Sequence, residues 1–152
     1  AGRLASLQEG LAAKDPYWAG QVEIQRRTAD AWIAYAKGDK AEALKRMQSA
    51  SDMESATEKA PVTPGAVLPA RELLADMLLE LGRPEQALKE YETVLTASPN
   101  RFNGLHGAAQ AAEKSGDMAK AKAYYEQLIT LSAHSDSDRP ELKQARGFLA
   151  KK

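Results

Sequence analysis

Apolar side chains recur along this chain at intervals of three and four residues, the spacing that places them on one face of an α-helix. No segment alternates apolar and polar residues with the two-residue period of a half-buried strand. The pattern therefore predicts an all-α fold of about eight helices. We expect these helices over residues 3–13, 16–37, 40–56, 69–81, 84–97, 101–115, 118–131 and 139–150.

Glycine, aspartate and proline mark the ends of the expected helices. A glycine just past a helix accepts the left-handed backbone conformation that ends it, and an aspartate before a helix accepts hydrogen bonds from its first amides. The glycines that end helices are Gly38, Gly82 and Gly116. The expected N-caps are Asp15, Asp39, Asp117 and, in a capping box with Glu141, Asp138.

Two segments of the chain match each other at a fixed offset of 34 residues, residues 82–91 and 116–125. A period of this length is typical of a solenoid, in which each helical hairpin buries its apolar face against its neighbours. The matched pairs are Gly82 with Gly116, Ala87 with Ala121, Tyr91 with Tyr125 and, just beyond, Val94 with Leu128.

These positions resemble the tetratricopeptide repeat (TPR), whose pattern places a small residue, glycine, alanine and an aromatic residue at fixed offsets. The repeats run over 68–101 and 102–135, with a degenerate copy at 24–56. Residues 1–23 precede them as an N-terminal helix and the start of a long one, 57–67 form a proline-rich insertion, and 138–151 a capping helix. The stretch from 56 to 82 is also similar to one in larger bacterial repeat proteins of undetermined function. The resemblance implies one domain, a right-handed α-solenoid whose concave groove binds an extended peptide or a partner's helix.

Charge and composition restrict the chemistry. The 21 Lys and Arg residues balance 21 Asp and Glu residues, so nothing favours general binding to nucleic acid or to an anionic membrane. Cysteine is absent, and the two histidines, His106 and His134, fall in different elements. The sequence therefore predicts no enzyme activity, no cofactor and no metal site.

The groove that the resemblance implies carries three carboxylates on one helix face, Glu72, Asp76 and Glu80, at i, i+4 and i+8. They form either an ordinary solvated face or an acidic floor for a basic partner with an apolar anchor. A third interpretation is a metal held by Glu72, Asp76 and His106. The other expected groove residues are Trp32, Tyr35, Asn103, His106, Gln110 and Glu113. The aromatic pair among them belongs either to the core or to a ligand platform.

The leading functional prediction is a non-catalytic protein-interaction module. The alternative is an accessory or regulatory domain of a longer enzyme or binding protein, since the chain begins without methionine. Self-association through a terminal helix is a third interpretation. The insertion at 57–67 acts either as a spacer or as a lid over the groove. No apolar run is long enough to span a membrane, so we expect a soluble protein, and the pattern leaves its compartment open between cytoplasm and periplasm.

Overall fold

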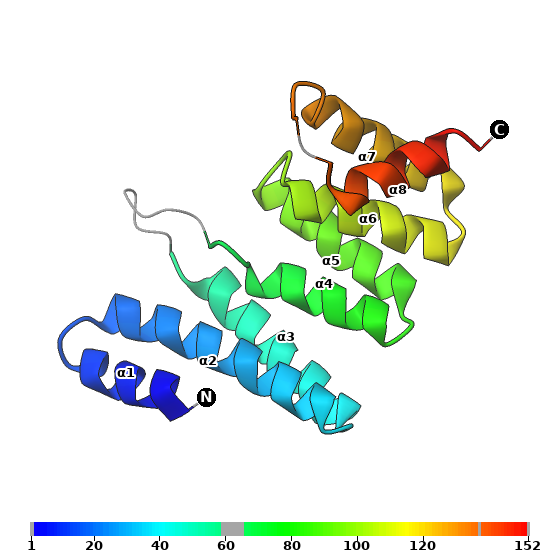
Figure 1. The fold of residues 1–152 in the computed structure, drawn as a ribbon. Coiled ribbons are helices and arrows are strands. Elements are labelled where there is room, and N and C mark those ends of the chain that lie inside the picture. Colours follow the sequence, from blue (N-terminus) through cyan, green and yellow to red (C-terminus); the bar gives the residue numbers. More distant parts are fainter. Residues whose placement is uncertain (1, 59–65, 137, 152) are drawn as a thin grey trace. The chain divides into compact units, whose positions relative to one another are not determined.

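The computed structural model describes residues 2–58, 66–136 and 138–151. Within these ranges the chain is helical and contains no strand, as the sequence predicts (Figure 1). Every expected helix is present, with each end within one residue of its prediction. The helices are α1 (Gly2–Ala12), α2 (Pro16–Ala36), α3 (Lys40–Ala56), α4 (Ala70–Glu80), α5 (Pro84–Ala97), α6 (Phe102–Ser115), α7 (Met118–Leu131) and α8 (Pro140–Leu149).

Three of the predicted N-caps are confirmed. The side chains of Asp15, Asp39 and Asp117 accept hydrogen bonds of 3.2, 3.1 and 3.0 Å from backbone amides three residues further on. The glycine stops are confirmed as well, because all three adopt positive φ, which costs a residue without Cβ little. Their φ angles are 88° at Gly38, 70° at Gly82 and 86° at Gly116.

The predicted capping box at α8 is wrong. Arg139, not Asp138, is the N-cap of α8, and it makes no side-chain capping bond. Pro140 occupies the first helical position, so the helix starts one residue later than the box requires. Asp138 instead pairs with Lys143 at 2.8 Å, while the carboxylate of Glu141 faces the Arg139 guanidinium at 3.3 Å.

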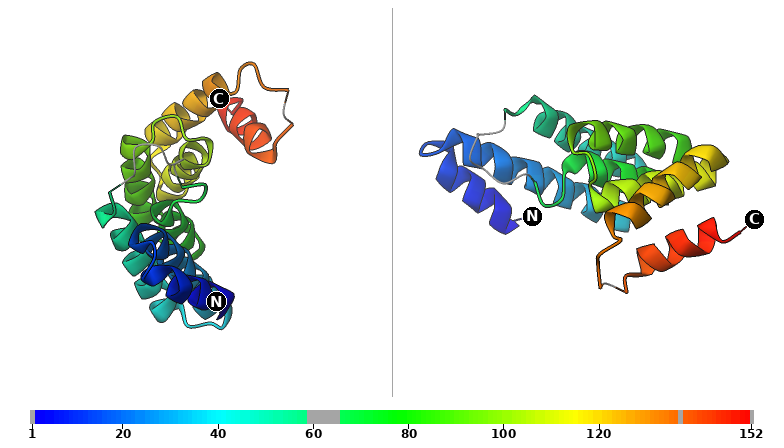
Figure 2. Two further views of the ribbon diagram at one scale, coloured as in Figure 1. Left: turned by 90° about the vertical axis from the view of Figure 1, so that its left-hand side faces the viewer. Right: turned by 90° about the horizontal axis from the view of Figure 1, so that it is seen from above.

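The chain packs as two compact units, residues 1–74 and 75–152, whose boundary falls inside α4. In the first unit α2 packs against both α1 and α3 (Figures 1 and 2). Its core contains Ile24 and Ala50 together with Ala70 from the start of α4, and Met53 packs against them.

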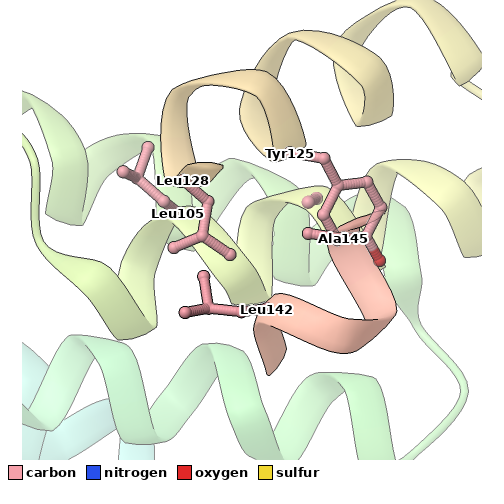
Figure 3. Close-up of a cluster of buried hydrophobic side chains, with 6 residues drawn as sticks. Leu105, Tyr125, Leu128, Leu142 and Ala145 are labelled. Atoms are coloured by element: carbon pink, nitrogen blue, oxygen red, sulfur yellow. The ribbon is translucent and has the colours of Figure 1, made fainter. Parts of the chain in front are cut away.

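In the second unit α5 packs against α6, α6 against α7 and α7 against α8 (Figures 1 and 2). The capping helix is firmly attached: Leu142 and Ala145 are buried, as expected, and Leu149 is half-buried. They join a cluster with Leu105, Ala109, Tyr125 and Leu128 of α6 and α7 (Figure 3). Burial of one leucine of this kind contributes roughly 1.5–3 kcal/mol.

The repeat's small residues lie where the resemblance places them, since Ala75, Ala109 and Ala121 are completely buried. An additional close approach was not predicted. A Cβ added to Gly107 of α6 would lie inside van der Waals distance of the Tyr91 ring of α5. The Tyr91 ring therefore requires a glycine at position 107 of the next helix.

Candidate functional site

The polar face of α6 is the part of the expected groove that the structure defines best. His106 Nε2 lies 3.1 Å from the side-chain oxygen of Gln144 in α8, and Gln110 donates to the same oxygen at 3.1 Å. Both residues are half-buried. Two predicted groove residues are thus brought together, and a residue of the chain's own capping helix contacts both.

The same network continues into α7 through Tyr125. The Gln144 amide donates to the Tyr125 hydroxyl at 3.0 Å, and this hydroxyl donates to the Glu113 carboxylate at 3.0 Å. Burial raises the pKa of Tyr125, and the hydrogen bond to Glu113 raises it further, so the phenol remains a protonated donor. The carboxylate of Glu113, the last predicted groove residue of this repeat, is therefore held by a hydrogen bond from a buried side chain of α7.

The register of these residues explains the arrangement. Asp76, Gln110 and Gln144 follow one another at the repeat interval of 34 residues. Helix α8 thus takes the position that the first helix of a further repeat would occupy, and its glutamine meets the equivalent glutamine of α6. Of the predicted groove residues on α6, Asn103 is exposed.

The carboxylate ladder on α4 differs from the expected row of three accessible acids. Glu72 is only 2% exposed, so its inclusion in an open acidic face is wrong. Asp76 is half-buried and accepts a hydrogen bond from the Tyr91 hydroxyl. Glu80 is exposed. The i, i+4 spacing places the three acids on one face of α4, but burial increases along this face from Glu80 to Glu72.

Trp32 and Tyr35 of α2 form a T-shaped aromatic pair with ring centroids 5.4 Å apart. Both residues are half-buried, a state between the two interpretations that the sequence left open. Each ring packs an edge or face against the other and leaves part of its surface accessible. Such a pair offers a fixed apolar area with a hydroxyl and an indole N–H at its margin.

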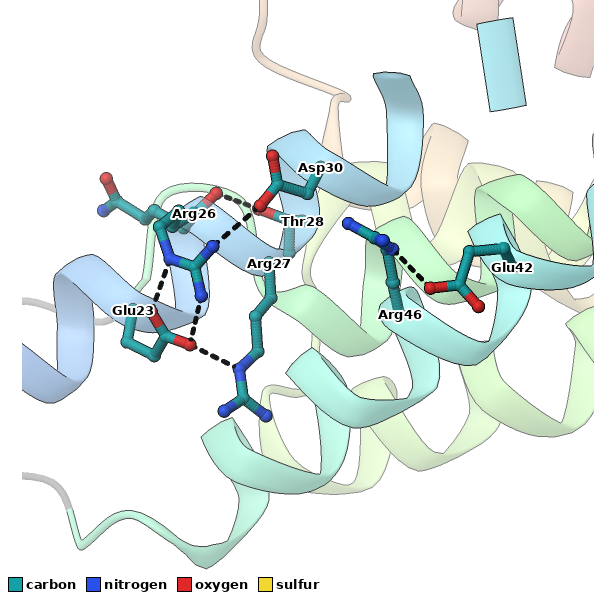
Figure 4. A network of polar contacts seen from close by, with 8 residues as sticks. Glu23, Arg26, Arg27, Thr28, Asp30, Glu42 and Arg46 are labelled. Carbon is teal, nitrogen blue, oxygen red and sulfur yellow. Dashed lines mark hydrogen bonds and ion pairs between the residues drawn. The ribbon is translucent and has the colours of Figure 1, made fainter. Parts of the chain in front are cut away.

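A second polar cluster, on α2 and α3, was not anticipated (Figure 4). Glu23 is 8% exposed and accepts hydrogen bonds from Arg26 at 2.7 and 2.8 Å and from Arg27 at 2.7 Å. These bonds hold the pKa of Glu23 below its ordinary value, because they stabilise the ionised carboxylate. The signal was available in the sequence, since Glu23 precedes the two arginines at i+3 and i+4.

Other sequence hypotheses find no support in the described residues. Nowhere in the described ranges do three or more potential metal ligands come together, so the metal set of Glu72, Asp76 and His106 is not formed. His134 is exposed. The proposed roles of the insertion depend on residues 59–65, which lie outside the described ranges. None of the described helices combines the length and apolar character that a membrane crossing needs.

The tetratricopeptide repeat profile matches residues 28–102 and 72–140, which together cover more than half of the chain. The chain belongs to the tetratricopeptide repeat family. No curated protein sequence matches it.

Among solved structures, the TPR chain is similar to PcrH from Pseudomonas aeruginosa, with 19% identity over 84% of this chain and 89% of that one and a TM-score of 0.64. PcrH in complex with the chaperone binding region of PopB matches with 18% identity over 83% and 94% of the two chains and a TM-score of 0.63. The first TPR domain of human RPAP3 matches with 13% identity over 84% and 92% and a TM-score of 0.61. At these identities the likeness shows the fold alone.

Proposed function

We propose that this protein is a non-catalytic interaction module that binds an extended peptide or a helix of a partner protein. The observation that carries the proposal is the TPR fold itself, seen in a similar protein, PcrH, with the chaperone binding region of PopB bound. The features of this chain that favour a binding role are polar and aromatic side chains at the family's groove positions, Trp32 and Tyr35 above all.

The aromatic pair on α2 is the strongest anchor for a partner. Trp32 and Tyr35 are partly accessible, and their T-shaped contact fixes both rings before any partner arrives. Rigid aromatic side chains lose little conformational entropy on binding and bury a large area, so they dominate many interfaces. A leucine, methionine or phenylalanine of the partner is the expected contact.

The polar contacts proposed for the second unit are fewer than the sequence suggested. Glu80 of α4 and Asn103 of α6 are exposed, while His106 and Gln110 already bond to Gln144. A basic residue of the partner would contact the exposed carboxylate of Glu80, and not a row of three accessible carboxylates. We therefore propose that apolar anchoring, with one acidic contact, decides recognition.

The test compares two variants of the full chain as immobilised baits. Trp32→Ala/Tyr35→Ala removes the proposed anchor, and Ile33→Ala, a 42% exposed residue rotated about 100° around the same helix, is the matched control. A captured protein is dissected into synthetic peptides, and each peptide is titrated by calorimetry against wild type and both variants. Circular dichroism verifies that the helix content of the variants is unchanged.

We expect a discrete peptide segment that binds wild type and Ile33→Ala with equal affinity. Its affinity for the aromatic variant should be at least about tenfold lower, which corresponds to the loss of one good apolar contact. Equal binding to all three proteins would refute the role of the pair. Binding only to the intact folded partner, with no peptide active, would refute segment recognition.

A further inference from the structure

A hollow of about 280 Å³ lies between α2 and α3 on the side of Glu23, and only polar and charged side chains line it. On α2 this side lies across the helix from Trp32, since residues 23, 26, 27 and 30 cluster on one arc at 100° per residue and residue 32 falls on the opposite one. The hollow is therefore separate from the aromatic pair to which we assign partner binding. The proposed function does not use the charged groups of this hollow.

The carboxylates in the lining already have cationic partners. Glu23 binds Arg26 and Arg27, Asp30 binds Arg26 at 2.9 Å, and Glu42 binds Arg46 at 2.7 Å. Each of these acids is thus neutralised by an arginine of its own helix. The acids give the lining its shape and hold the arginines, and they offer little attraction to a basic ligand.

Among the described residues, the cationic side chains of the lining keep one unpaired charge, on Lys45, and several unused arginine N–H donors. Four basic residues face three acidic ones, which leaves a net charge of 4 − 3 = +1. Within the described ranges, no carboxylate lies at ion-pair distance from Lys45. Nη2 of Arg27 and both Nη atoms of Arg46 donate no hydrogen bond to any atom of the described residues.

The arginine donors are held in place by contacts made before any ligand binds. Arg27 donates through Nε to buried Glu23 and through Nη1 to Ser49 of α3, both at 2.7 Å, so its guanidinium bridges the two helices. Arg46 is oriented by its Nε bond to Glu42 at 2.7 Å (Figure 4). A guanidinium fixed in this way loses little side-chain entropy when a carboxylate accepts its remaining hydrogens.

We propose that this hollow is an anion site, formed by Arg27, Lys45 and Arg46, that binds the carboxylate side chains of an acidic segment in a partner polypeptide. A planar carboxylate matches the free edge of a guanidinium, and one negative charge balances the surplus of +1. Nucleic acid binding requires a larger cationic surplus than this lining provides. The site would thus select a partner region opposite in charge to one recognised by Glu80.

The test uses a glutamate-rich peptide with blocked termini, the same peptide with glutamine in place of glutamate, and inorganic phosphate as probes. Each is titrated into the isotopically labelled full chain at low salt, and backbone amide shifts are mapped by NMR. The variant Lys45→Glu removes a cation with no partner among the described residues, and Lys122→Glu, an exposed lysine of α7, makes the same change in net charge elsewhere. Fluorescence anisotropy measures the affinity of the labelled peptides for each protein.

We expect shifts centred on residues 42–49 with the glutamate peptide and none with the glutamine peptide. Lys45→Glu should weaken the glutamate peptide at least about tenfold, as expected for loss and reversal of a charge-assisted contact, while Lys122→Glu changes the affinity little. Equal weakening by the two variants would mean that net charge alone attracts the peptide, and would overturn the site. The same shifts produced by phosphate and not by the peptide would overturn the assignment to a polypeptide carboxylate. Because the shift map uses unaltered protein, it decides the question even if a variant folds poorly.

Discussion

Replacing Gly107 by alanine should destabilise the protein, although alanine is the better helix former. In the interior of a helix this change alone gains roughly 0.8–1.0 kcal/mol. At Gly107, however, the new Cβ would overlap Cε1, Cζ and the hydroxyl oxygen of Tyr91. The sign of the effect therefore depends on whether the Tyr91 ring can move away.

The surroundings of Tyr91 oppose such a movement. The residue is 1% exposed, and its hydroxyl donates to the carboxylate of Asp76. Overpacking a filled core costs about 1–3 kcal/mol, and losing a buried hydrogen bond to a charged acceptor costs about 1.5–3 kcal/mol. After the helix gain is subtracted from the sum of these costs, we expect Gly107→Ala to lower the free energy of unfolding by about 1.5–5 kcal/mol.

Urea denaturation followed by circular dichroism measures this difference, and Gly147→Ala is the control. Gly147 also lies inside a helix, α8, but nothing lies within 4 Å of its added Cβ, so the same substitution should stabilise the protein by up to about 1 kcal/mol. In a Tyr91→Leu background, with a smaller side chain at that contact, Gly107→Ala should cost much less. A Gly107→Ala protein as stable as wild type would refute the claim that the ring is held in place.

Three further substitutions test separate parts of the structure. Ser51→Ala should raise the free energy of unfolding by about 0.5–1 kcal/mol, because within the described residues the buried Ser51 hydroxyl has no hydrogen-bond partner, and a lower urea midpoint would contradict this. Asp117→Ala should lower the free energy of unfolding by about 1 kcal/mol, because the N-cap of α7 is lost, whereas Asp117→Asn should retain most of the stabilisation by the cap. Glu23→Gln should cost about 1–2 kcal/mol at neutral pH. The pKa of Glu23 is lowered in the fold by the hydrogen bonds from Arg26, so this stabilising contribution is present above the ordinary pKa and disappears as the pH falls through the lowered value. Urea titrations at about pH 7 and pH 3 should therefore show the unfolding free energies of wild type and Glu23→Gln converging in acid. A difference that stays constant with pH would contradict the ionised pair.

Helix positions were predictable because many of the helix ends carry a local signal. Gly116 must adopt a left-handed conformation, Asp117 can cap the following helix, and both requirements involve only neighbouring residues. The one failed cap, Asp138, lies two residues before Pro140, where a shift of a single residue decides which residue becomes the N-cap.

The environment of individual side chains was harder to predict, since it depends on contacts between helices. Helical spacing correctly placed Glu72 and Asp76 on one face, but it carries no information on what covers that face, and Glu72 is buried. The contact of Gly107 with Tyr91 joins two helices and leaves no periodic trace. Trp32 and Tyr35 remain predicted binding residues that only a partner can test.

Helix α8 also affects which polar groups of α6 are available to the proposed partner. Helix α8 covers the apolar face formed by α6 and α7 with Leu142 and Ala145. Covering that face places Gln144 beside His106 and Gln110, which satisfies the polar groups that a ligand of the last repeat would use. A ligand there would have to replace these hydrogen bonds while it gained its own, so little net free energy remains for binding. The surfaces of the first unit carry no such cost, because the Trp32 and Tyr35 rings remain partly accessible and Lys45 has no partner among the described residues. We therefore expect a partner to bind the first unit and not the face of α6 that α8 covers.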